Sequence, residues 1–407
     1  MQVLLSSIGS RGDVQPIVAL GLELQALGHR ARLCVAPNFK EWIESYGLEC
    51  TPIGPDLKKM TGGTVPGKPV LPFSQEQLQQ FAEQMVRGQF QVIAEAARDC
   101  DLIVAAGALQ IATRSIADMR NIPYIFAAYC PAVLPSSKYP PPKMDGHYSH
   151  SLSETENEQF WKEDEESFNQ RFGAVLNEER AKLGLDSVTS VQRYMFTERP
   201  WLAADHALAP AFPVAGMEVV QTGAWMISEE TPLPEEIEEF LVAGAPPVYL
   251  GFGSMRASDQ TGRVLVEAAR ALGLRSILSQ GWAGLTPQDA QTDCLSIGDV
   301  NHAALFPRMA AIVHHGGAGT THTAARAGTP QVIIPHNYDQ FYWAHRVQET
   351  GVGVSGPLRD DITVENLARA LSEALRPAVR RRARELAGRM ELHGARIAAK
   401  RLVKEFS

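Results

Sequence analysis

The chain has 407 residues, and 38 Lys and Arg against 46 Asp and Glu leave a formal net charge of −8. At roughly 150 residues per domain, this length predicts two or three domains. A composition of 45% hydrophobic and 21% charged residues excludes wholesale disorder. The acidic balance argues against a protein that binds nucleic acid through bulk charge. No run of 18 apolar residues is present, so we expect no transmembrane segment.

The start of the chain and its cysteines indicate a cytoplasmic protein. The first residues, MQVLLSSIGSRGD, lack the basic region and the small-residue cleavage site of a signal peptide. The five cysteines are scattered without a CxxC pair, which is typical of buried thiols in a reducing compartment. The only close His pair is His314 and His315, whose side chains would diverge on a strand, so we expect no metal site.

The first 36 residues predict a strand, a helix and a second strand. Val3 to Leu5 is a short apolar run, followed by a turn at Gly9 to Asp13. Apolar residues then recur at helical spacing: Ile17, Leu20, Leu24 and Leu27. Gly28 ends this helix, and Ala31 to Ala36 forms the next strand. Short connections of this kind indicate a parallel crossover and therefore an α/β sheet.

The alternation of helices and strands continues through the first half. Asn38 with Glu41, and Ser74 with Gln77, each have the spacing of a capping box that opens a helix. Two further buried strands are expected: Asp101 to Gly107 and Pro123 to Ala128. Before these strands, Gly54 to Pro72 is rich in Gly and Pro without apolar periodicity, which predicts a long functional or disordered loop.

A second α/β series follows Thr231 to Pro234, where two prolines predict a linker. The expected strands are Val248 to Phe252, Ser276 to Leu278, Ile312 to His315 and Gln331 to Ile334. The expected helices between them are Gln260 to Leu272, Thr320 to Ala327 and Gln340 to Glu349. The Arg-rich end of the chain predicts an amphipathic helix with a solvated basic face.

The strongest local motif is IVHHGGAGTT, residues 312–321, where an apolar strand leads through glycines into a helix. This arrangement gathers free backbone N–H groups and the positive end of a helix dipole at one point, where phosphates bind. A purely structural glycine turn is the alternative. A second such turn, Gly251 to Ser254, also follows an apolar strand, and together the two turns fit a diphosphate. Neither is a Walker loop or a clean GxGxxG, which argues against simple ATP or NAD binding.

Polar side chains also stand where two strands end. Asp339 and Gln340 follow the strand Gln331 to Pro335 and begin a helix, and such groups suit sugar hydroxyls. A helix N-cap is the alternative for Asp339. Asp13 has the same alternative on the first long helix. It lies, however, at the carboxyl end of the first strand, where α/β sheets place their chemistry.

These motifs together resemble family 1 glycosyltransferases. The likeness rests on SRGDVQP (10–16), GFGS (251–254), HHGGAGTT (314–321) and DQ (339–340), and it extends over nearly the whole chain. PPVYLGFGS, VNHAALF and AARAGTPQ resemble bacterial enzymes that glycosylate glycopeptide antibiotic aglycones. SRGDVQP and the HHGG turn are similar to sterol glucosyltransferases.

The resemblance implies the GT-B fold, in which two Rossmann-like, doubly wound α/β domains face each other across a cleft. It places an acceptor-binding domain at residues 1–225 and a nucleotide-sugar-binding domain at residues 226–390. A terminal helix in residues 391–407 is expected to pack back on the first domain. We expect a monomer.

The family pattern also assigns roles to individual residues. Asp13 is the expected general base. The residues that match donor-binding positions are Ser10, Gly253, Ser254, Val300, His315, Gly316, Gly317, Gly319, Thr320, Asp339 and Gln340. Among them, His315 and Ser254 are expected at the diphosphate, and Asp339 and Gln340 at the sugar hydroxyls. No metal or other cofactor is expected, since the helix end would take its place.

Two departures from plant relatives limit this transfer of roles. Those enzymes carry a Trp near Asp299 that stacks on the base and a Glu near Thr323 that binds ribose, and neither is present here. Side chains therefore leave UDP and TDP undecided. Plant relatives also use His where this chain has Asp13, so no second residue that orients the base can be carried over. Trp282 could line the donor cleft or pack in a core.

The reaction implied by the resemblance is inverting transfer of a sugar, with glucose expected, to a hydroxyl of a hydrophobic or aromatic natural product. The loops Gly54 to Pro72 and Cys130 to His147 are expected to contact the acceptor. A sterol or other lipid acceptor is one alternative. A GT-B nucleotide-sugar epimerase and a non-catalytic nucleotide-sugar-binding protein are the others.

Overall fold

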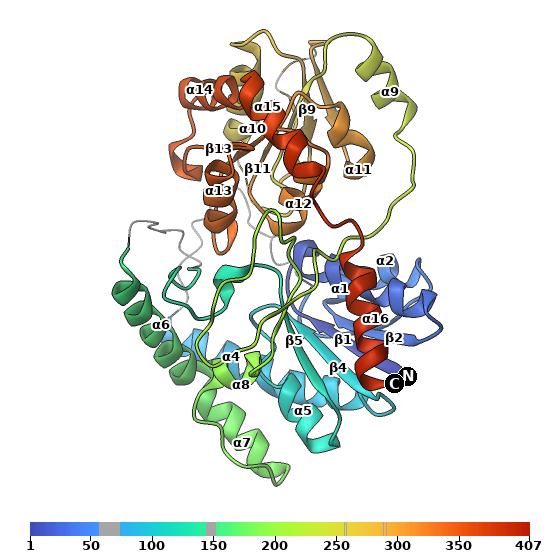
Figure 1. Cartoon of the computed structure of the whole chain (residues 1–407), viewed down its shortest axis with the longest axis vertical. Coiled ribbons are helices and arrows are strands. Elements are labelled where there is room, and N and C mark those ends of the chain that lie inside the picture. Colours follow the sequence, from blue (N-terminus) through green and yellow to red (C-terminus); the bar gives the residue numbers. More distant parts are fainter. Residues whose placement is uncertain (57–73, 144–151, 256, 258, 288, 290) are drawn as a thin grey trace.

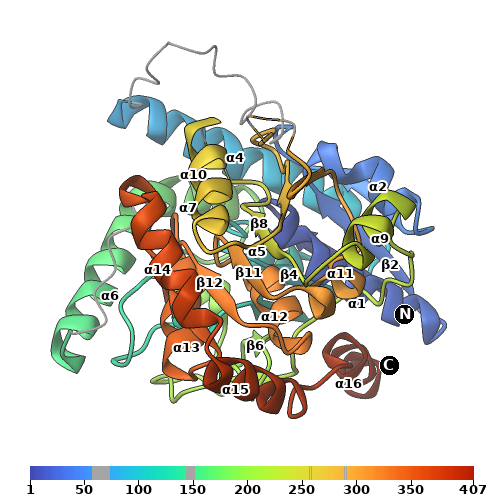
Figure 2. The ribbon, with the colours of Figure 1, turned by 90° about the horizontal axis from the view of Figure 1, so that it is seen from above.

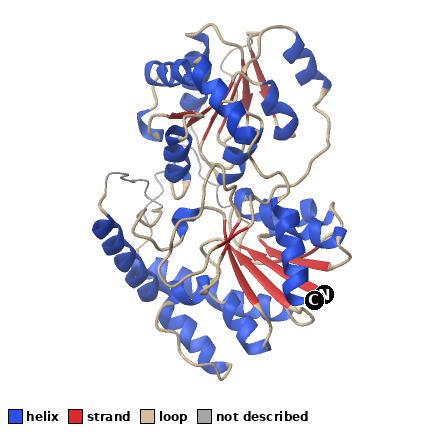
Figure 3. Cartoon of the chain, in the orientation of Figure 1, coloured by secondary structure: helices blue, strands red, loops and turns tan. Residues whose placement is uncertain are grey.

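The computed structural model describes most of the chain: residues 1–56, 74–143, 152–255, 257, 259–287, 289 and 291–407. Figure 1 shows two lobes stacked along the longest axis. Figure 3 shows one sheet in each lobe with helices around it. Neighbouring strands of both sheets pair in parallel. The predicted α/β fold class is therefore confirmed.

The first lobe holds a seven-stranded sheet, within the described residues, in the order β3-β2-β1-β4-β5-β6-β7. Its strands are β1 (Gln2–Ser7), β2 (Arg30–Val35), β3 (Glu49–Pro52), β4 (Leu102–Ala106), β5 (Tyr124–Ala128), β6 (Trp201–Leu202) and β7 (Val220–Gln221). β1 is buried along its whole length, as expected of an interior parallel strand that is covered on both faces.

The second lobe holds a six-stranded sheet in its described part, in the order β10-β9-β8-β11-β12-β13. Its strands are β8 (Val248–Gly251), β9 (Ser276–Ser279), β10 (Cys294–Ile297), β11 (Ala311–His314), β12 (Gln331–Ile333) and β13 (Gly353–Ser355). β8, β11 and β12 lie side by side, so the turns that follow these three strands meet at one edge of the sheet.

Helices surround both sheets (Figures 1 and 2). Those of the first lobe are α1 (Arg11–Ala26), α2 (Lys40–Glu44), α4 (Gln75–Ala96), α5 (Thr113–Arg120), α6 (Glu154–Phe168), α7 (Ala174–Lys182) and α8 (Val191–Phe196). Those that follow are α9 (Glu235–Val242), α10 (Asp259–Arg270), α11 (His302–Leu305), α12 (Ala318–Arg326), α13 (Gln340–Glu349), α14 (Val364–Ala374), α15 (Pro377–Ala387) and α16 (Gly394–Phe406). In the described part of the chain, none is both long enough and apolar enough for a membrane crossing.

Of the two predicted capping boxes, one is confirmed and one is wrong. Ser74 caps α4, since its hydroxyl accepts from the Gln77 N–H and its own N–H donates to the Gln77 side chain. No such box opens at Asn38. A 3₁₀ turn, Pro37–Phe39, comes first, and α2 then begins without a side-chain cap. Proline has a fixed φ and no N–H to satisfy, so it starts the turn earlier than the predicted cap.

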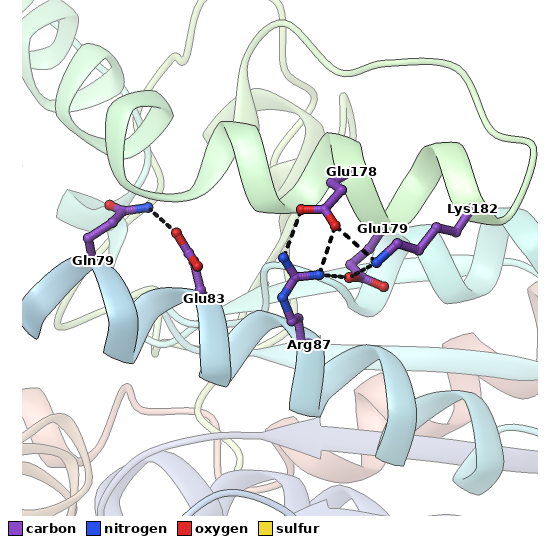
Figure 4. A network of polar contacts seen from close by, with 6 residues as sticks. All are labelled: Gln79, Glu83, Arg87, Glu178, Glu179 and Lys182. Atoms are coloured by element: carbon purple, nitrogen blue, oxygen red, sulfur yellow. Dashed lines mark hydrogen bonds and ion pairs between the residues drawn. The ribbon is translucent and has the colours of Figure 1, made fainter. Parts of the chain in front are cut away.

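A surface network of ion pairs connects Glu178 and Glu179 of α7 to α4 (Figure 4). Arg87 of α4 donates to Glu178, at 2.7 Å from one guanidinium nitrogen, and also to Glu179. Lys182 pairs with the same two carboxylates, at 3.0 and 2.8 Å. Each exposed ion pair alone contributes little to the stability of the fold. In this network the ion pairs share partners, and together they hold the two helices in place against each other.

The last helix of the chain, α16, returns from the second lobe to the first (Figure 1). Its buried side chains, among them Ala398 and Leu402, belong to the same apolar cluster as Val3 and Leu5 of β1. They pack beside α1, whose Ile17 belongs to that cluster as well. The end of the chain is thus part of the core of the lobe that its beginning forms.

The interlobe segment, residues 203–212, follows β6 and binds the second lobe through buried backbone groups. The Asp205 N–H donates to Nε2 of His322 on α12, at 3.1 Å. The Leu208 carbonyl accepts two hydrogen bonds from Arg346 on α13, at 3.1 and 2.8 Å. Because burial lowers the pKa of His322 to about 4, its ring is neutral at pH 7 and keeps Nε2 free to accept.

The same segment also joins the apolar cores of the lobes. Phe212 contacts Tyr139, and Tyr139 stands edge-on to Tyr342 of α13, with ring centroids 5.1 Å apart. The Asp205 carboxylate accepts from the Glu391 N–H at 2.8 Å, just before the chain re-enters the first lobe. These contacts give the two sheets a fixed relation to each other.

Candidate functional site

The predicted site residues lie at the carboxyl ends of strands in both lobes. Asp13 follows β1. In the second lobe, the turn with Ser254 follows β8, the turn with His315 follows β11, and Asp339 follows β12. The Asp13 carboxylate contributes to a raised pKa of Asp339, so the two groups are near each other although they come from different lobes. We call this set the interlobe site.

The Asp13 side chain is fixed by the first turn of its own helix. One carboxylate oxygen, Oδ2, accepts from the Ser10 N–H at 2.7 Å and from the Ser10 hydroxyl at 3.1 Å. Gly9 makes room for this carboxylate, because a Cβ on it would stand 2.2 Å from Oδ2. The other oxygen, Oδ1, faces Gly107 at the end of β4 and accepts no hydrogen bond from the described residues. Asp13 is therefore both a cap and a carboxylate with one available oxygen.

Two hydroxyl groups that sequence reasoning missed anchor the backbone of Asp13. Its carbonyl accepts from Tyr129 at 2.9 Å and from Ser7 at 3.0 Å. Ser7 ends β1 and Tyr129 directly follows β5. A polar aromatic residue just beyond a buried strand is the signal that could have indicated Tyr129. These bonds hold the first turn of α1 against the edge of the sheet.

Partial burial raises the pKa of Asp13 above its ordinary value, and the two bonds from Ser10 oppose this rise. A carboxylate with a raised pKa is a stronger base than a solvated one. The pKa of Tyr129 is raised as well, first by burial and then by the charge of Asp13, so this hydroxyl stays a donor at neutral pH. The local electrostatics suit proton acceptance at Asp13.

The glycine turn after β11 is shaped by two different histidines. His314 is fully buried, and its ring spans the turn by pairing with Gln331 at 2.9 Å and accepting from the Gly316 N–H at 3.1 Å. Gly316 has φ +91°, and a Cβ there would stand 2.6 Å from Ile333. Only glycine fits at this position without displacing β12. His314 and Gly316 therefore form the turn.

His315 points toward the other glycine turn. A Cβ on Gly253 would be 3.3 Å from Cε1 of His315, and one on Gly317 would be 2.5 Å from its Nε2. Its Nδ1 is buried and has no hydrogen-bond partner among the described residues. Burial lowers the pKa of His315 to about 4, so the ring is neutral at pH 7. An orphaned ring nitrogen between two glycine turns is the group that a ligand would satisfy.

The start of α12 holds further residues that are predicted to contact phosphate. Gly317 is the N-cap residue of α12, and no side chain caps this end of the helix. Gly319 is exposed and Thr320 is half-buried in the first turn. Across from them, Ser254 is half-buried in the turn after β8. Free amides at a helix N-terminus, two hydroxyls and a histidine form a site suited to an anion.

Asp339 occupies the N-cap position of α13 but makes no capping bond with its side chain. Its Oδ2 instead accepts from the indole N–H of Trp343, one helical turn later, at 2.9 Å. Burial is the main cause that raises the pKa of Asp339 to about 7, and the charge of Asp13 adds to it. The capping alternative for Asp339 is thus wrong, and Trp343 is a partner that the sequence did not reveal.

Gln340 has a different environment from its neighbour. It is 5% exposed, and its side-chain carbonyl accepts from the N–H groups of His336 at 2.7 Å and Asn337 at 3.2 Å. Its amide nitrogen donates to the Asn337 side chain at 3.0 Å. Gln340 therefore closes the turn after β12, and a sugar contact by Gln340 stays a prediction.

The remaining predicted residues lie toward the rim of the site. Val300 is half-buried against the apolar cluster of Leu305 and Phe306. Asp299 beside it forms an ion pair with Arg11 of α1 at 3.4 Å. Trp282 packs, half-buried, against the apolar cluster of the first lobe, and its backbone N–H donates to the Gly253 carbonyl at 2.8 Å. Trp282 thus bridges the lobes.

The described residues contain no group of three or more His, Cys, Asp or Glu side chains arranged to hold a metal ion. Most of the predicted loop from Gly54 to Pro72 lies outside the described residues, and so does the end of the loop from Cys130 to His147.

Two protein domains match parts of this chain. Residues 3–136 match the glycosyltransferase family 28 N-terminal domain, and residues 293–395 match the C-terminal domain of erythromycin biosynthesis protein CIII-like proteins. Over its whole length the chain is 42% identical to the vancomycin aglycone glucosyltransferase of Amycolatopsis orientalis, of which it covers 98%. It is 31% identical, over 96% of its length, to sterol 3-beta-glucosyltransferase UGT80A2 of Arabidopsis thaliana, of which it covers 63%.

Solved structures with the same fold are more distant in sequence. The calicheamicin glycosyltransferase CalG4 superposes with a TM-score of 0.69 at 20% identity, with 100% of this chain and 98% of that chain covered. The glycosyltransferase VinC, solved in complex with dTDP, gives 0.68 at 20% identity with the same coverage. At this level of identity the likeness shows the fold of two facing parallel-sheet domains.

The pKa of Asp339 makes stability depend on pH. Because the folded-state pKa of about 7 exceeds the ordinary 3.8, protonation of this carboxyl favours the folded chain. The stability that it contributes is complete below about pH 4 and is lost as the pH rises through 7. We therefore expect Asp339→Asn, which mimics the neutral acid, to melt at a higher temperature than the parent protein at pH 8. The difference should vanish near pH 4.

Differential scanning calorimetry at both pH values measures this difference. Asp360→Asn is the matched control, because this exposed carboxylate has a pKa that Arg359 lowers. It should show no gain at pH 8. An Asp339→Asn variant that melts at or below the parent temperature at pH 8 would contradict a strained, buried carboxylate.

Proposed function

Because this chain belongs to the glycosyltransferases that include the vancomycin aglycone glucosyltransferase, we propose that it glycosylates a hydrophobic or aromatic natural product of the glycopeptide-aglycone type. The proposed donor is a UDP- or TDP-sugar, with glucose as the sugar, and the transfer inverts the anomeric centre. The main support is the arrangement of the interlobe site, with Asp13 after β1 of one lobe and the two glycine turns and Asp339 after the adjacent strands β8, β11 and β12 of the other.

In the proposed reaction, Asp13 accepts the proton of the acceptor hydroxyl. An ordinary carboxyl has a pKa near 3.9, so it cannot ionise an alcohol beforehand. The proton therefore moves to Oδ1 while the acceptor oxygen forms its bond to the anomeric carbon. The bond from that carbon to the diphosphate breaks on the opposite face, and its electron pair leaves with the diphosphate. General bases typically contribute about 10²–10⁴-fold to the rate.

The departing diphosphate is assigned to the N-terminus of α12. Backbone amides at Gly317 and Gly319, the hydroxyls of Ser254 and Thr320, and the neutral ring of His315 are its proposed partners. They act where negative charge develops, which is usually the largest single source of acceleration. An anion beside His315 favours the protonated ring, so diphosphate binding is expected to raise its pKa from about 4.

The sugar is assigned to Asp339. Its pKa of about 7 means that this carboxyl is partly protonated at neutral pH, so it can both accept from and donate to sugar hydroxyls. Trp343 holds Oδ2 and leaves the second oxygen for the ligand. Gln340 stabilises the turn before Asp339, because its side-chain carbonyl accepts from the backbone N–H groups of His336 and Asn337.

A product assay tests the proposal. We expect incubation with UDP-glucose or TDP-glucose and a panel of glycopeptide aglycones to give free nucleotide and a new glycoside, detected by mass spectrometry. A parallel sterol panel tests the one alternative acceptor class, which the 31% identity to a sterol glucosyltransferase favours. Sterol glucosides alone would transfer the proposal to that class. An epimerised donor, or no turnover with any acceptor, would refute it.

Asp13→Asn should depress turnover by about 10²-fold or more, because the amide cannot take the proton. Its carbonyl oxygen can still accept from Ser10, so helix α1 keeps its cap. Asp101→Asn is the matched control, since Asp101 also accepts a backbone N–H, from Gln2 at 2.7 Å, but at the opposite edge of the sheet. Steady-state rates of both variants are compared. Near-parental turnover of Asp13→Asn, or an equal loss in Asp101→Asn, would argue against the general base.

His315→Ala and Asp339→Ala should separate the diphosphate from the sugar. His315→Ala should weaken free UDP or TDP roughly tenfold or more, because a hydrogen bond to a charged group is worth about 1.5–3 kcal/mol. Asp339→Ala should hardly change the affinity of the free nucleotide, and it should weaken the intact nucleotide sugar and relax sugar discrimination. Calorimetric titration with nucleotide and with nucleotide sugar gives these affinities.

Trp343→Phe is the control for Asp339→Ala. It removes the indole donor but keeps an aromatic ring at this position and the carboxylate of Asp339. If Asp339→Ala weakens nucleotide and nucleotide sugar equally, Asp339 acts on the whole turn, and its sugar-binding role fails.

A further inference from the structure

The end of the chain carries a charge opposite to that of the rest. Residues 376–404 contain ten Lys and Arg and two Glu, a net charge of +8 in 29 residues. Since the whole chain carries −8, all other residues together carry −16. The interlobe site uses none of these basic side chains. Such a reversal within one short segment marks a surface for an anionic partner.

Most of these cations are exposed and unpaired. Seven of the ten make no hydrogen bond or ion pair with any described residue through their side chains, and all seven are exposed: Arg376, Arg380, Arg384, Arg389, Arg396, Lys400 and Lys404. We call these seven residues the basic face. Its charges are therefore available to a partner, because no acidic side chain of the described chain neutralises them directly.

The spacing of these residues places them in two stripes. Arg376, Arg380 and Arg384 follow one another at four-residue intervals along α15, and Arg396, Lys400 and Lys404 do so along α16. Residues four apart lie on the same face of a helix. In both helices the apolar, buried side chains lie on a different face from these stripes. Both stripes therefore point away from the protein core.

The two helices lie on the same side of the molecule. In Figure 1 both are in front, α15 on the second lobe and α16 on the first. In Figure 2, which is seen from above, both lie along the same lower edge. The basic face thus extends over both lobes, and an extended flat partner can contact both stripes at once.

Two exposed aliphatic side chains near the stripes favour a lipid surface over a nucleic acid. Leu392 lies between α15 and α16, Ile397 lies on α16 next to Arg396, and they are 59% and 41% exposed. Aliphatic side chains gain from entering the interface of a bilayer, and they gain nothing from a phosphate backbone. Residues 376–404 contain no Phe, Tyr or Trp, so the aromatic platforms on which unpaired bases stack are absent from this sequence.

We propose that the basic face, together with the exposed side chains of Leu392 and Ile397, docks this enzyme on membrane surfaces rich in anionic lipids. The attachment is peripheral: arginine and lysine side chains contact lipid headgroups, and the two aliphatic side chains enter the interface. Hydrophobic acceptors partition into such surfaces, so docking would raise their concentration near the interlobe site. The docking itself does not depend on the identity of the acceptor or of the sugar.

Vesicle sedimentation with the full chain tests this proposal. We expect the protein to pellet with vesicles of equal parts phosphatidylglycerol and phosphatidylcholine at about 0.1 M salt, and not with phosphatidylcholine alone. Each basic residue near an anionic surface contributes about 1 kcal/mol, which is about fivefold in the partition coefficient. Arg380→Gln with Lys400→Gln should therefore reduce binding about 25-fold.

A charge-matched control isolates the basic face. Lys162→Gln with Arg193→Gln removes two exposed cations from α6 and α8 and should change binding less than twofold. Leu392→Ser should lower vesicle binding severalfold and leave binding to a DNA duplex unchanged. Sugar transfer to a soluble acceptor without vesicles should be equal in all variants, so a failure of the transferase assignment is seen separately.

Three results would overturn docking. The first is equal sedimentation with the two kinds of vesicle. The second is a double variant of the basic face that sediments like the parent protein. The third is a DNA duplex that binds as tightly as the anionic vesicles, with no effect of Leu392→Ser, which would assign the surface to nucleic acid.

Discussion

The hydrogen bonds of the interlobe segment are the constraint on which the rest of the site depends. The backbone of Asp205 and Leu208 in the first lobe binds His322 of α12 and Arg346 of α13. These two helices begin at the glycine turn and at Asp339, so the segment positions both against the lobe that carries Asp13. A lost bond would leave a buried polar group unpaired, which costs about 1–3 kcal/mol. The position of Asp13 relative to the glycine turn and Asp339 is therefore fixed by the fold.

Burial between the lobes then sets the protonation of every central group in the same direction. It raises the pKa of Asp13 and Asp339 and lowers that of His315, and in each case desolvation is the first cause. All three groups are thereby driven toward their neutral forms. In the proposed reaction a diphosphate would favour a protonated His315, and sugar hydroxyls would solvate Asp339. Shifted pKa values that a bound ligand would reverse are typical of functional sites.

Sequence patterns predicted what is local, and they missed what the fold brings together. The strand–turn–helix units, the Ser74 cap and the two glycine turns are each formed by a continuous stretch of the chain, so periodicity and turn chemistry suffice to find them. The partners Tyr129 and Ser7 come from different strands, and no spacing in the chain links them to Asp13. Trp343 is four residues from Asp339, and the Asp339 carboxylate accepts from its indole N–H instead of capping the helix. The Asn38 cap failed because Pro37 imposed its own turn first.

The capping and catalytic readings of Asp13 are compatible, because they use different oxygens. Ser10 donates twice to Oδ2 and holds the plane of the carboxylate, while Oδ1 faces the end of β4 without a partner in the described chain. In this arrangement Ser10, at the start of the helix, orients the Asp13 carboxylate. In a dyad of base and acid, a second side chain has that role. A glycine stands at the end of β4, so no side chain competes for Oδ1 there. A carboxylate placed this way needs no separate residue to orient it, since the first turn of α1 already supplies that restraint.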